Sequence, residues 1–183
     1  MVTRLGGITF YLLLGGQMDC VLRFAKENEL PLIWEMYEAA RSYDGCVWGD
    51  NYPDKEILLD DFNKNNLCVF VLKNKIIGAI SIEFDDYLDD AGCWKVQSDK
   101  SVSFARVVIA KDFLGQGYGT KMVEKLLNVF QENDWDVVRI LVSPYNKSAM
   151  SIYKKLGFDF ICVREFFEQD FWLCEKVLKE RTQ

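Results

Sequence analysis

The chain has 183 residues, and half of them are apolar. At roughly 150 residues per domain, this length predicts a single domain that can bury a sizeable core. The 28 acidic and 22 basic side chains give a net charge of −6, which argues against nucleic acids and anionic membranes as main partners. Histidine is absent, so Ser-His-Asp and Cys-His mechanisms are excluded, as are nearly all zinc sites other than all-cysteine ones.

The cysteines are spread along the chain and form no C-x-x-C pair: Cys20, Cys46, Cys68, Cys93, Cys162 and Cys174. In a chain of this length, scattered cysteines are typical of small buried hydrophobic residues in a reducing compartment. We therefore expect a cytoplasmic protein with no metal site and no disulfide framework.

Residues 1–17 differ from the rest of the chain. Leu5 to Gly16 is an apolar run behind a single Arg4, but it lacks a signal-peptide cleavage site and is too short to span a bilayer. The patterned sequence begins at Met18, so we divide the chain into a leader, 1–17, and a single domain, 18–183. Both a start-site extension and an added edge strand or partner contact fit the composition of the leader.

The first half of the domain mixes strands and helices. In chain order we predict a strand at 20–25, a helix from Asn28 to Arg41, a helix opened by Pro53 and Asp54, and strands at 67–72 and 76–85. Asn28 is the expected N-cap of the first helix, and Pro31 falls in its first turn, where proline is tolerated. The Lys73-Asn74-Lys75 turn joins the last two strands as a hairpin.

The second half continues in the same way. We predict a strand at 101–110, a helix at 118–131, a strand at 137–142, a helix at 146–156, and strands at 158–163 and 171–174. The helix at 118–131 is amphipathic, and Gly157 ends the helix at 146–156. This mixture predicts an α/β (α+β mixed) fold with one mixed sheet and helices packed on both faces.

One segment, Val107 to Thr120, runs from a strand through a glycine-rich turn into a helix. Free backbone N–H groups at a helix N-terminus form an anion site, and glycines let a pyrophosphate approach the main chain. The segment is not a P-loop, because no Gly-Lys-Ser/Thr follows. Nor is it a dinucleotide fingerprint, because Thr120 and Met122 break the spacing. Taken alone, it fits a plain strand-to-helix turn.

A second segment, Asn146 to Phe158, lies one strand later. Together the two segments resemble the cofactor signature of the GNAT superfamily of N-acetyltransferases. The first is similar to V-x-P-x-x-R/Q-x-x-G-x-G and the second to N-x-x-A-x-x-x-Y-x-x-x-G-F. The resemblance covers about Cys20 to the C-terminus. It implies a central mixed sheet of about six to seven strands flanked by helices on both faces, and acetyl-CoA as co-substrate.

The resemblance also implies cofactor-binding roles. The backbone of Val107, Val108 and Ile109 would pair with the pantetheine arm of acetyl-CoA. The pyrophosphate would be held by the amides of Gly115, Gln116, Gly117, Tyr118, Gly119 and Thr120. Asn146 would either contact the pantetheine or cap its own helix. Two positions depart from the family pattern: Leu114 stands where Arg or Gln is usual, and Lys111 where Pro is common.

Tyr153 is the residue that the resemblance places near the thioester sulfur, as hydrogen-bond donor and general acid. The thiol of the leaving group has a pKa of about 8.5 and tyrosine one of about 10, so full proton transfer is uphill by about 2 kcal/mol. Strong hydrogen bonding to the thiolate is the better description, and such help is worth ~10²–10⁴ in rate. A buried core tyrosine on an amphipathic helix is the alternative interpretation.

The attacking amine must be neutral. Deprotonating an ammonium with a pKa of about 10.4 costs roughly 4–5 kcal/mol at pH 7, so a base should assist. Apolar and polar residues alternate from Ile80 to Asp85, and Glu83 and Asp85 therefore share a face. Because the family often places a base on this strand, we choose Glu83. An ordinary surface carboxylate is the alternative.

Acidic residues are concentrated between Asp44 and Asp90, where eleven of them stand against four lysines, a net charge of −7. In the family this region borders the acceptor site. We therefore expect a cationic acceptor, either a small amine or a basic peptide, drawn by this field. Trp48, Tyr52 and Trp94 could stack on it, beside Asp85. A solvated acidic surface explains the same charge.

We thus expect an acetyl-CoA-dependent N-acetyltransferase that moves an acetyl group to a primary amine by direct attack in a ternary complex. We expect no metal, no nucleic acid and no membrane among its partners, and leave open whether it forms a homodimer. The alternative on the same fold is a non-catalytic module that binds or senses acyl-CoA.

Overall fold

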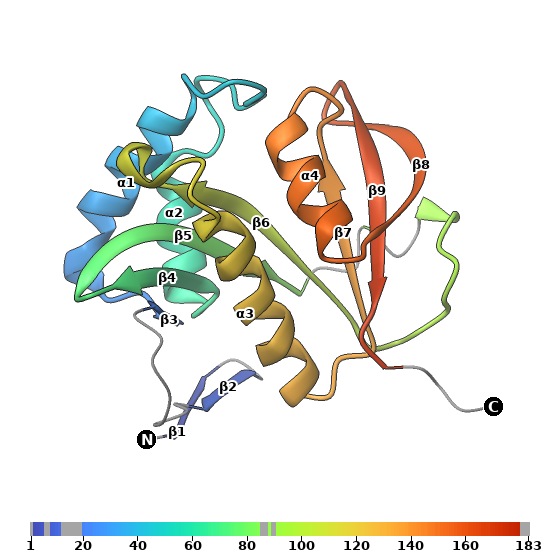
Figure 1. The fold of residues 1–183 in the computed structure, drawn as a ribbon, viewed down its shortest axis with the longest axis horizontal. Coiled ribbons are helices and arrows are strands. Elements are labelled where there is room, and N and C mark those ends of the chain that lie inside the picture. Colours follow the sequence, from blue (N-terminus) through green and yellow to red (C-terminus); the bar gives the residue numbers. More distant parts are fainter. Residues whose placement is uncertain (1, 6–7, 12–19, 85–87, 89–90, 180–183) are drawn as a thin grey trace.

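The computed structural model describes residues 2–5, 8–11, 20–84, 88 and 91–179 (Figure 1). Its main sheet has seven strands in the order β3-β4-β5-β6-β7-β9-β8. These strands are β3 (Cys20–Phe24), β4 (Leu67–Leu72), β5 (Lys75–Glu83), β6 (Ser101–Ile109), β7 (Val137–Val142), β8 (Asp159–Phe166) and β9 (Gln169–Val177). The helices are α1 (Leu30–Ala40), α2 (Lys55–Asn63), α3 (Tyr118–Glu132) and α4 (Lys147–Lys155). None of the described helices is long and apolar enough to cross a membrane.

Helices cover both faces of the sheet, as expected, because successive side chains of a strand point to opposite faces. In β4, Cys68 and Phe70 join the large core cluster that includes the apolar side of α3. Leu67 and Val69 point the other way and join the cluster formed with α1 and α2. Figure 1 shows the corresponding layers, with α3 and α4 in front of the sheet and α1 and α2 on its other side.

Strands β6 and β7 are the parallel pair of the sheet, and they are joined over a short stretch. Their register pairs are Ser101 with Val137 and Val102 with Val138. Beyond Val102 the two strands diverge, with the C-terminal half of β6 leaning toward β5 and β7 toward β9 (Figure 1). The sheet is therefore open between the C-terminal ends of β6 and β7.

Most element boundaries agree with those predicted from the sequence, and two differ. Asn28 lies inside a 3-10 turn (Glu27–Glu29) instead of capping α1, whose N-cap is Glu29. The Glu29 carboxylate accepts the Lys26 N–H at 2.8 Å and pairs with Arg23, which fixes the chain before α1. The last two strands are longer than predicted and pair as a hairpin from Asp159 with Glu175 to Phe166 with Gln169.

The described residues of the leader do not add a strand to the edge of the main sheet. They form strands β1 (Val2–Leu5) and β2 (Ile8–Tyr11), which pair with each other as a separate two-stranded sheet. Strand β2 lies against α3. The division of the chain at residue 17 remains a prediction.

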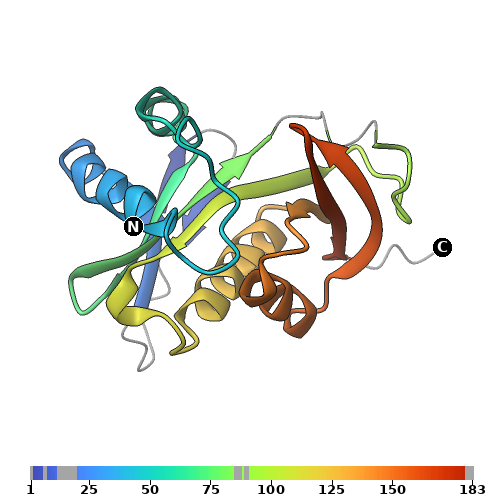
Figure 2. The same cartoon turned by 90° about the horizontal axis from the view of Figure 1, so that it is seen from above.

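The loop between α1 and α2 crosses the molecule toward α4 (Figure 2). Gly45, in this loop, has a φ of +74°, and a Cβ at this position would lie 2.4 Å from the carbonyl oxygen of Tyr145. Only glycine allows both this backbone conformation and this approach. The loop is therefore seated on the start of α4, above the C-terminal end of β6.

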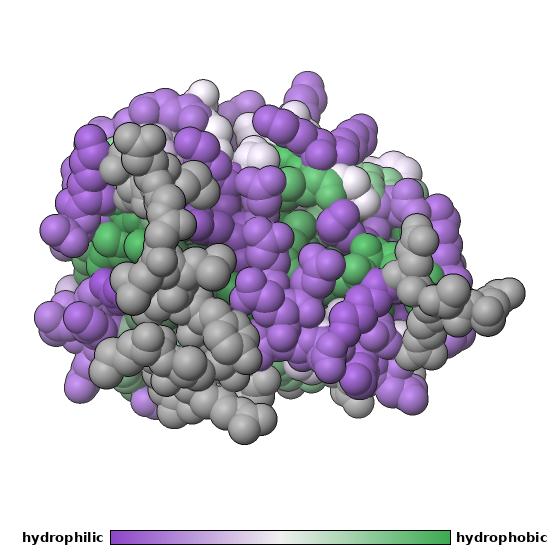
Figure 3. Space-filling view, turned by 60° about the horizontal axis from the view of Figure 1, so that its bottom comes forward, coloured by the Kyte–Doolittle hydropathy of each residue, from purple (hydrophilic) through white to green (hydrophobic). Residues whose placement is uncertain are grey.

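One face of the molecule is largely polar where its residues are described (Figure 3). On the face drawn in Figure 3, hydrophilic side chains cover most of the area, and hydrophobic ones show between them in small groups. Most of the large apolar residues that the structure describes lie inside, chiefly in the two clusters on either side of the sheet.

Candidate functional site

The turn between β6 and α3 is open toward solvent. Gly115 and Gly117 have φ values of +70° and +80°, the left-handed conformation that favours glycine. A Cβ built on either residue has no atom within 4 Å. The predicted phosphate-binding segment is therefore a main-chain turn with open space beside both glycines.

Helix α3 begins at this turn without a side-chain cap. Its N-cap is Gly117, which has no side chain to accept a hydrogen bond. The amides of Tyr118, Gly119 and Thr120 precede the first intrahelical bond, which runs from the Lys121 N–H to the Gly117 carbonyl at 3.1 Å. Unpaired amides at the start of a helix of 15 residues, together with its dipole, form a site for an anion.

The side chains around this turn leave the amides accessible. Gln116 turns away and donates its side-chain N–H to the Asp112 carbonyl at 2.8 Å. Tyr118 packs edge-on against Phe113, and the Lys121 ammonium lies 5.4 Å from the Tyr118 ring. A lysine thus stands beside the anion site and adds to its positive potential.

The predicted pantetheine-binding strand follows a β-bulge in β6. The pairing with β5 shifts between Ala79 and Ser81, and Arg106 takes a φ of +52°, which is rare for a side-chain-bearing residue. Val107 and Ile109 pack on the α3 side and Val108 on the α1 side. The three residues lie in the part of β6 that is no longer paired with β7.

Tyr153 is buried on the same face of the sheet as α3. It is 6% exposed and packs against Phe104 and Phe158, with ring centroids 5.8 and 5.5 Å away. Burial raises the pKa of Tyr153, and the neighbouring Cys174 raises it further. The hydroxyl therefore stays protonated and can act as a hydrogen-bond donor.

Asn146 caps α4. Its Oδ1 accepts the Ala149 N–H at 2.9 Å. The geometry thus matches the capping role that the sequence left open, and a contact with pantetheine remains a prediction.

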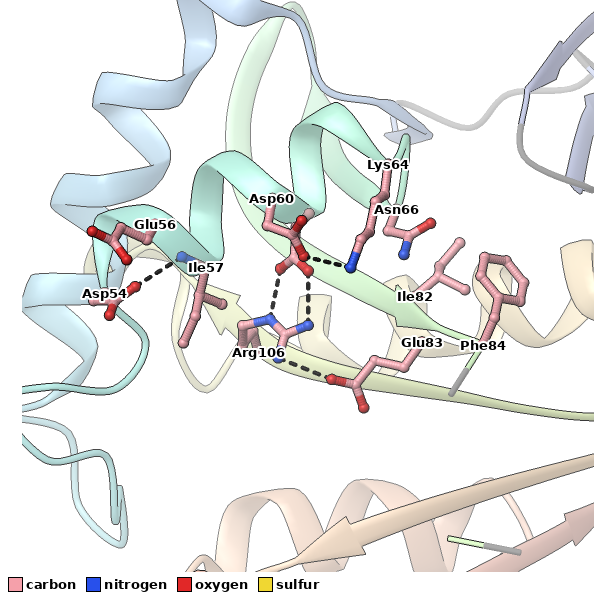
Figure 4. A pocket seen from close by; sticks show the side chains of 11 residues that line it. Asp54, Glu56, Ile57, Asp60, Lys64, Asn66, Ile82, Glu83, Phe84 and Arg106 are labelled. Carbon is pink, nitrogen blue, oxygen red and sulfur yellow. Dashed lines mark hydrogen bonds and ion pairs between the residues drawn. The ribbon is translucent and has the colours of Figure 1, made fainter. Parts of the chain in front are cut away.

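A pocket of about 610 Å³ lies on the opposite face of the sheet, between α2 and the ends of β5 and β6 (Figure 4). Five carboxylates and two cationic side chains are among its residues. The lining comprises Asp54, Glu56, Ile57, Asp60, Asp61, Lys64, Asn66, Ile82, Glu83, Phe84 and Arg106. We call this the acidic pocket, and its negative charge makes it suited to a cation.

Glu83 enters the acidic pocket from the end of β5. Its side chain is 13% exposed, and Oε1 lies 2.9 Å from Nη1 of Arg106. Glu83 and Tyr153 therefore lie on opposite faces of the sheet, and the unpaired stretch between β6 and β7 separates them. Asp85, expected on the same face as Glu83, lies outside the described residues.

Arg106 and Asp61 are pocket residues that the sequence reasoning missed. Arg106 donates from Nε and Nη2 to both oxygens of Asp61, at 2.7 and 2.9 Å. Both side chains are less than a tenth exposed. Two signals were available, because Asp61 follows Ile57 and Leu58 on the inward side of α2, and Arg106 interrupts an apolar strand.

Two of the three predicted acceptor-site aromatics lie together. Trp48 packs edge-on against Tyr52 with centroids 6.3 Å apart. The Tyr52 hydroxyl accepts a hydrogen bond from Nη1 of Arg106 at 3.2 Å, which places Tyr52 beside the acidic pocket.

Trp94 does not join them. It is 8% exposed in a separate cluster with Leu88 and Leu173. Its indole N–H donates to the Leu88 carbonyl at 2.6 Å, and the Arg139 guanidinium lies 5.1 Å from its ring. This ring is buried, has a cationic partner within the protein and does not line the acidic pocket, and its contact with the acceptor stays a prediction.

The described residues contain no group of three or more cysteine, aspartate or glutamate side chains placed to hold a metal ion. The candidate site thus has polar groups on both faces of the sheet. On the α3 face these are the main-chain amides at the start of α3 and the Tyr153 hydroxyl, and on the other face they are the carboxylates of the acidic pocket.

Comparison with known proteins identifies relatives with N-acyltransferase names. The chain is similar to a thialysine N-epsilon-acetyltransferase of Bos taurus, with 25% identity over 97 residues, 53% of this chain and 52% of the relative. The corresponding protein of Sus scrofa is 21% identical over 158 residues, 83% of this chain and 88% of the relative. An L-amino acid N-acyltransferase, MnaT of Escherichia coli, is 23% identical over 140 residues, 75% and 78% of the two chains.

Solved structures share the fold. A GNAT-family acetyltransferase of Streptococcus agalactiae superposes with a TM-score of 0.76 and 20% identity, covering 88% of this chain and 96% of that one. The yncA protein of Salmonella typhimurium, solved with its cofactor acetyl-CoA, has a TM-score of 0.68 and 18% identity, covering 91% and 98%. The model of the acetyltransferase (GNAT) family matches residues 33–158, more than half of the chain. The open glycine turn, the uncapped α3 and the parted strands thus occur in a chain that belongs to the GNAT acetyltransferase family.

Proposed function

We propose that this acyltransferase moves the acetyl group of acetyl-CoA to a primary amine of a cationic acceptor, by direct attack within a ternary complex. One observation carries the proposal. The anion site and Tyr153 lie on one face of the sheet, and the acidic pocket with Glu83 lies on the other. We infer that acetyl-CoA and the acceptor meet beside the stretch where β6 and β7 are unpaired.

The residues around α3 suit acetyl-CoA. The amides of residues 115–120 would hold its pyrophosphate, since the turn is open and the helix start uncapped. The backbone of residues 107–109 would pair with the pantetheine arm as an added strand. Leu114, where the family pattern has Arg or Gln, is 43% exposed, so main-chain groups and Lys121 supply the binding here.

The reaction breaks the thioester C–S bond and forms an amide C–N bond. Bound acetyl-CoA supplies the acetyl group as a thioester. Glu83 gives a defined destination, directly or through water, to the proton that the acceptor ammonium must lose at a cost of roughly 4–5 kcal/mol at pH 7. The neutral amine then attacks the thioester carbonyl, and as the amide forms its second N–H proton is lost to solvent while CoA leaves as a thiolate that takes up a proton from solvent. The Tyr153 hydroxyl donates a hydrogen bond to the departing thiolate, and its raised pKa makes it a donor that keeps its proton.

The acceptor is defined by the charge of the pocket. Five carboxylates against Lys64 and Arg106 leave the lining with an excess of negative charge, and Asp60 and Lys64 already pair at 2.7 Å. Trp48 and Tyr52 border this charge and, with Asp85, would contact the acceptor. The mammalian and bacterial relatives are both named as enzymes that transfer an acyl group to nitrogen, which fits an amine acceptor.

The direct test is the release of free CoA thiol from acetyl-CoA in the presence of matched amines. We would compare a linear diamine, a monoamine of the same chain length and an L-amino acid. We expect the diamine to give the highest kcat/KM, because its second ammonium stays charged inside the acidic pocket. If no amine stimulates release while acetyl-CoA still raises the melting temperature, the chain binds acyl-CoA without transferring it.

Glu83→Gln tests the proposed base. The substitution keeps the size of the side chain and its hydrogen bond to Arg106, and removes the proton acceptor. We expect kcat/KM for the diamine to fall by a factor on the order of 10²–10⁴ and its low-pH inflection to disappear. A variant with an unchanged pH–rate profile would remove Glu83 from the mechanism.

A further inference from the structure

Arg106 connects Glu83 with two elements that do not themselves enter the proposed chemistry. Its Nη1 lies 2.9 Å from Oε1 of Glu83 at the end of β5 and donates to the Tyr52 hydroxyl of the α1–α2 loop at 3.2 Å. Its other two donor nitrogens bind both oxygens of Asp61 on α2. Figure 4 shows Arg106 between α2 and Glu83, with its guanidinium pointing into the pocket.

The guanidinium is held rigidly. A two-point contact with a carboxylate fixes the plane of an arginine as well as its position. The Asp61 end is fixed in turn, because its Oδ2 also accepts the Ser81 hydroxyl at 2.6 Å. The backbone of Arg106 takes its φ of +52° at the bulge, a conformation that costs on the order of 1–3 kcal/mol and persists where the surroundings enforce it.

The charges of Arg106 and its two carboxylate partners, Asp61 and Glu83, do not cancel. One guanidinium faces two carboxylates, and the titratable groups around it are Tyr52, Asp61, Glu83 and the buried Tyr37 of α1. Burial lowers the pKa of Arg106, but Tyr52, Asp61 and Glu83 raise it by more, so the net pKa lies above the ordinary value. Arg106 is therefore a permanent cation beside Glu83.

We propose that Arg106 is the positioning residue of the acceptor site. Anchored by Asp61 and Tyr52, it holds the Glu83 carboxylate in one orientation. The inference rests on the proposed function, because it takes Glu83 as the group that receives the proton of the amine. Through their contacts with Arg106, α2 and the α1–α2 loop then help to set the activity of Glu83 as a base.

Two substitutions with opposite charge effects test the proposal. Arg106→Gln removes the cation beside Glu83, so the low-pH inflection of kcat/KM should move up. Asp61→Asn removes a like charge and leaves Arg106 paired chiefly with Glu83, so the inflection should move down. The asparagine keeps the shape of the side chain and one oxygen acceptor, and this variant serves if Arg106→Gln does not fold.

Arg139→Gln is the matched control. Arg139 is also a buried arginine beside a carboxylate, Glu175, but it lies on β7 and does not line the acidic pocket. Its loss should lower the melting temperature and leave the pH–rate profile in place. Arg106→Lys keeps the charge and loses the two-point contact. It should keep the inflection near its original pH while kcat falls about tenfold to a hundredfold, since misplaced groups react slowly.

The outcomes separate the two proposals. If Glu83→Gln abolishes the inflection but Arg106→Gln and Asp61→Asn leave it in place, Arg106 is purely structural and the positioning role is overturned. If Glu83→Gln itself leaves the inflection, the proposed base fails first. Shifts of opposite sign in the two charge variants support the positioning role, because a general loss of stability cannot produce them.

Discussion

Tyr153 combines a buried ring with a hydroxyl whose pKa is raised by burial. A raised pKa makes full proton transfer to a thiolate still less favourable than the roughly 2 kcal/mol cost expected from ordinary values. The physical role that remains is a strong hydrogen bond to the sulfur as negative charge develops there. This role requires the hydroxyl and does not require its ionisation.

Tyr153→Phe should therefore lower kcat by about a hundredfold and leave the KM for acetyl-CoA nearly unchanged. The phenylalanine ring keeps the packing against Phe104 and Phe158, so the melting temperature should stay within a few degrees. Single-turnover rates would measure the effect on the chemical step. Tyr145→Phe is the control, because Tyr145 is 72% exposed in the loop before α4. Equal kcat values for the wild type and Tyr153→Phe would contradict the role.

For single residues, the sequence was informative where the main chain or a motif decides the role. The glycines of the α3 turn and Asn146 were placed correctly as a strand-to-helix turn and a helix start. The Arg106–Asp61 contact joins residues 45 positions apart and depends on how α2 packs on β6. The burial of Trp94 could not be predicted, because an aromatic residue in a polar loop gives no sign that the loop folds back to bury it.

Among the helices and strands, α3 depends most on the residue type at its start, Gly117. Gly117 has a φ of +80°, where a side chain is strained, although open space surrounds its Cβ position. A substitution there acts through the backbone, because it moves the amides that follow.

Gly117→Ala should accordingly raise the KM for acetyl-CoA about tenfold or more and change kcat at saturating cofactor little. The reason is that a strain of about 1–3 kcal/mol is relieved by shifting the amides that would hold the pyrophosphate. Thermal-shift titration with CoA and with dephosphorylated pantetheine would show the loss for CoA alone. Gly49→Ala is the matched control, since a Cβ at Gly49 meets nothing within 4 Å and its φ is not positive. A Gly117→Ala variant that binds CoA as tightly as the wild type would refute the anion site.

The element that the sequence predicted least well is the β8–β9 hairpin. Its turn is formed by Phe167 and Glu168, both with positive φ, 53° and 60°. Tight hairpin turns are usually signalled by Asn-Gly or Asp-Gly, so this turn carried no recognisable sign. The strand β8 also lies at the edge of the sheet and alternates weakly in burial, which hides its period.

Across the domain, the alternating patterns predicted strands, helices and a mixed sheet, but not the order of the strands. That order depends on contacts distant in sequence, such as the parallel pairing of β6 and β7 over two residue pairs. Tyr153 and Glu83 lie on opposite faces of the sheet because Tyr153 packs with α3 and Glu83 faces α2. The resemblance between the two motifs and a known family supplied the mixed sheet and the roles expected of the two residues, but not this arrangement.

The distribution of charge over the molecule gives the final prediction. Residues 44–90 carry more negative charge than the chain as a whole, and the acidic pocket lies within this stretch apart from Arg106. A dicationic acceptor should be attracted to this field before it binds, and salt weakens such attraction because the Debye length falls from about 10 Å at 0.1 M to about 3 Å at 1 M. We expect kcat/KM for the diamine to fall more steeply with ionic strength than that for the monoamine of the same length. Both assays use the same acetyl-CoA, so its own salt dependence cancels in the comparison.

A Glu56→Gln variant tests whether a carboxylate of the acidic pocket causes this salt dependence. Glu56 lies at the first turn of α2 on the pocket wall, apart from the Arg106 group (Figure 4). Removing its charge should flatten the salt dependence for the diamine and leave the value for the monoamine within about twofold, since only the second ammonium gains from that charge. The same substitution should leave the low-pH inflection unchanged, because Glu56 does not contact Glu83 or Arg106. If kcat/KM falls equally with ionic strength for the two amines in the wild type, the acidic pocket does not select the acceptor, and its charge only keeps the protein soluble.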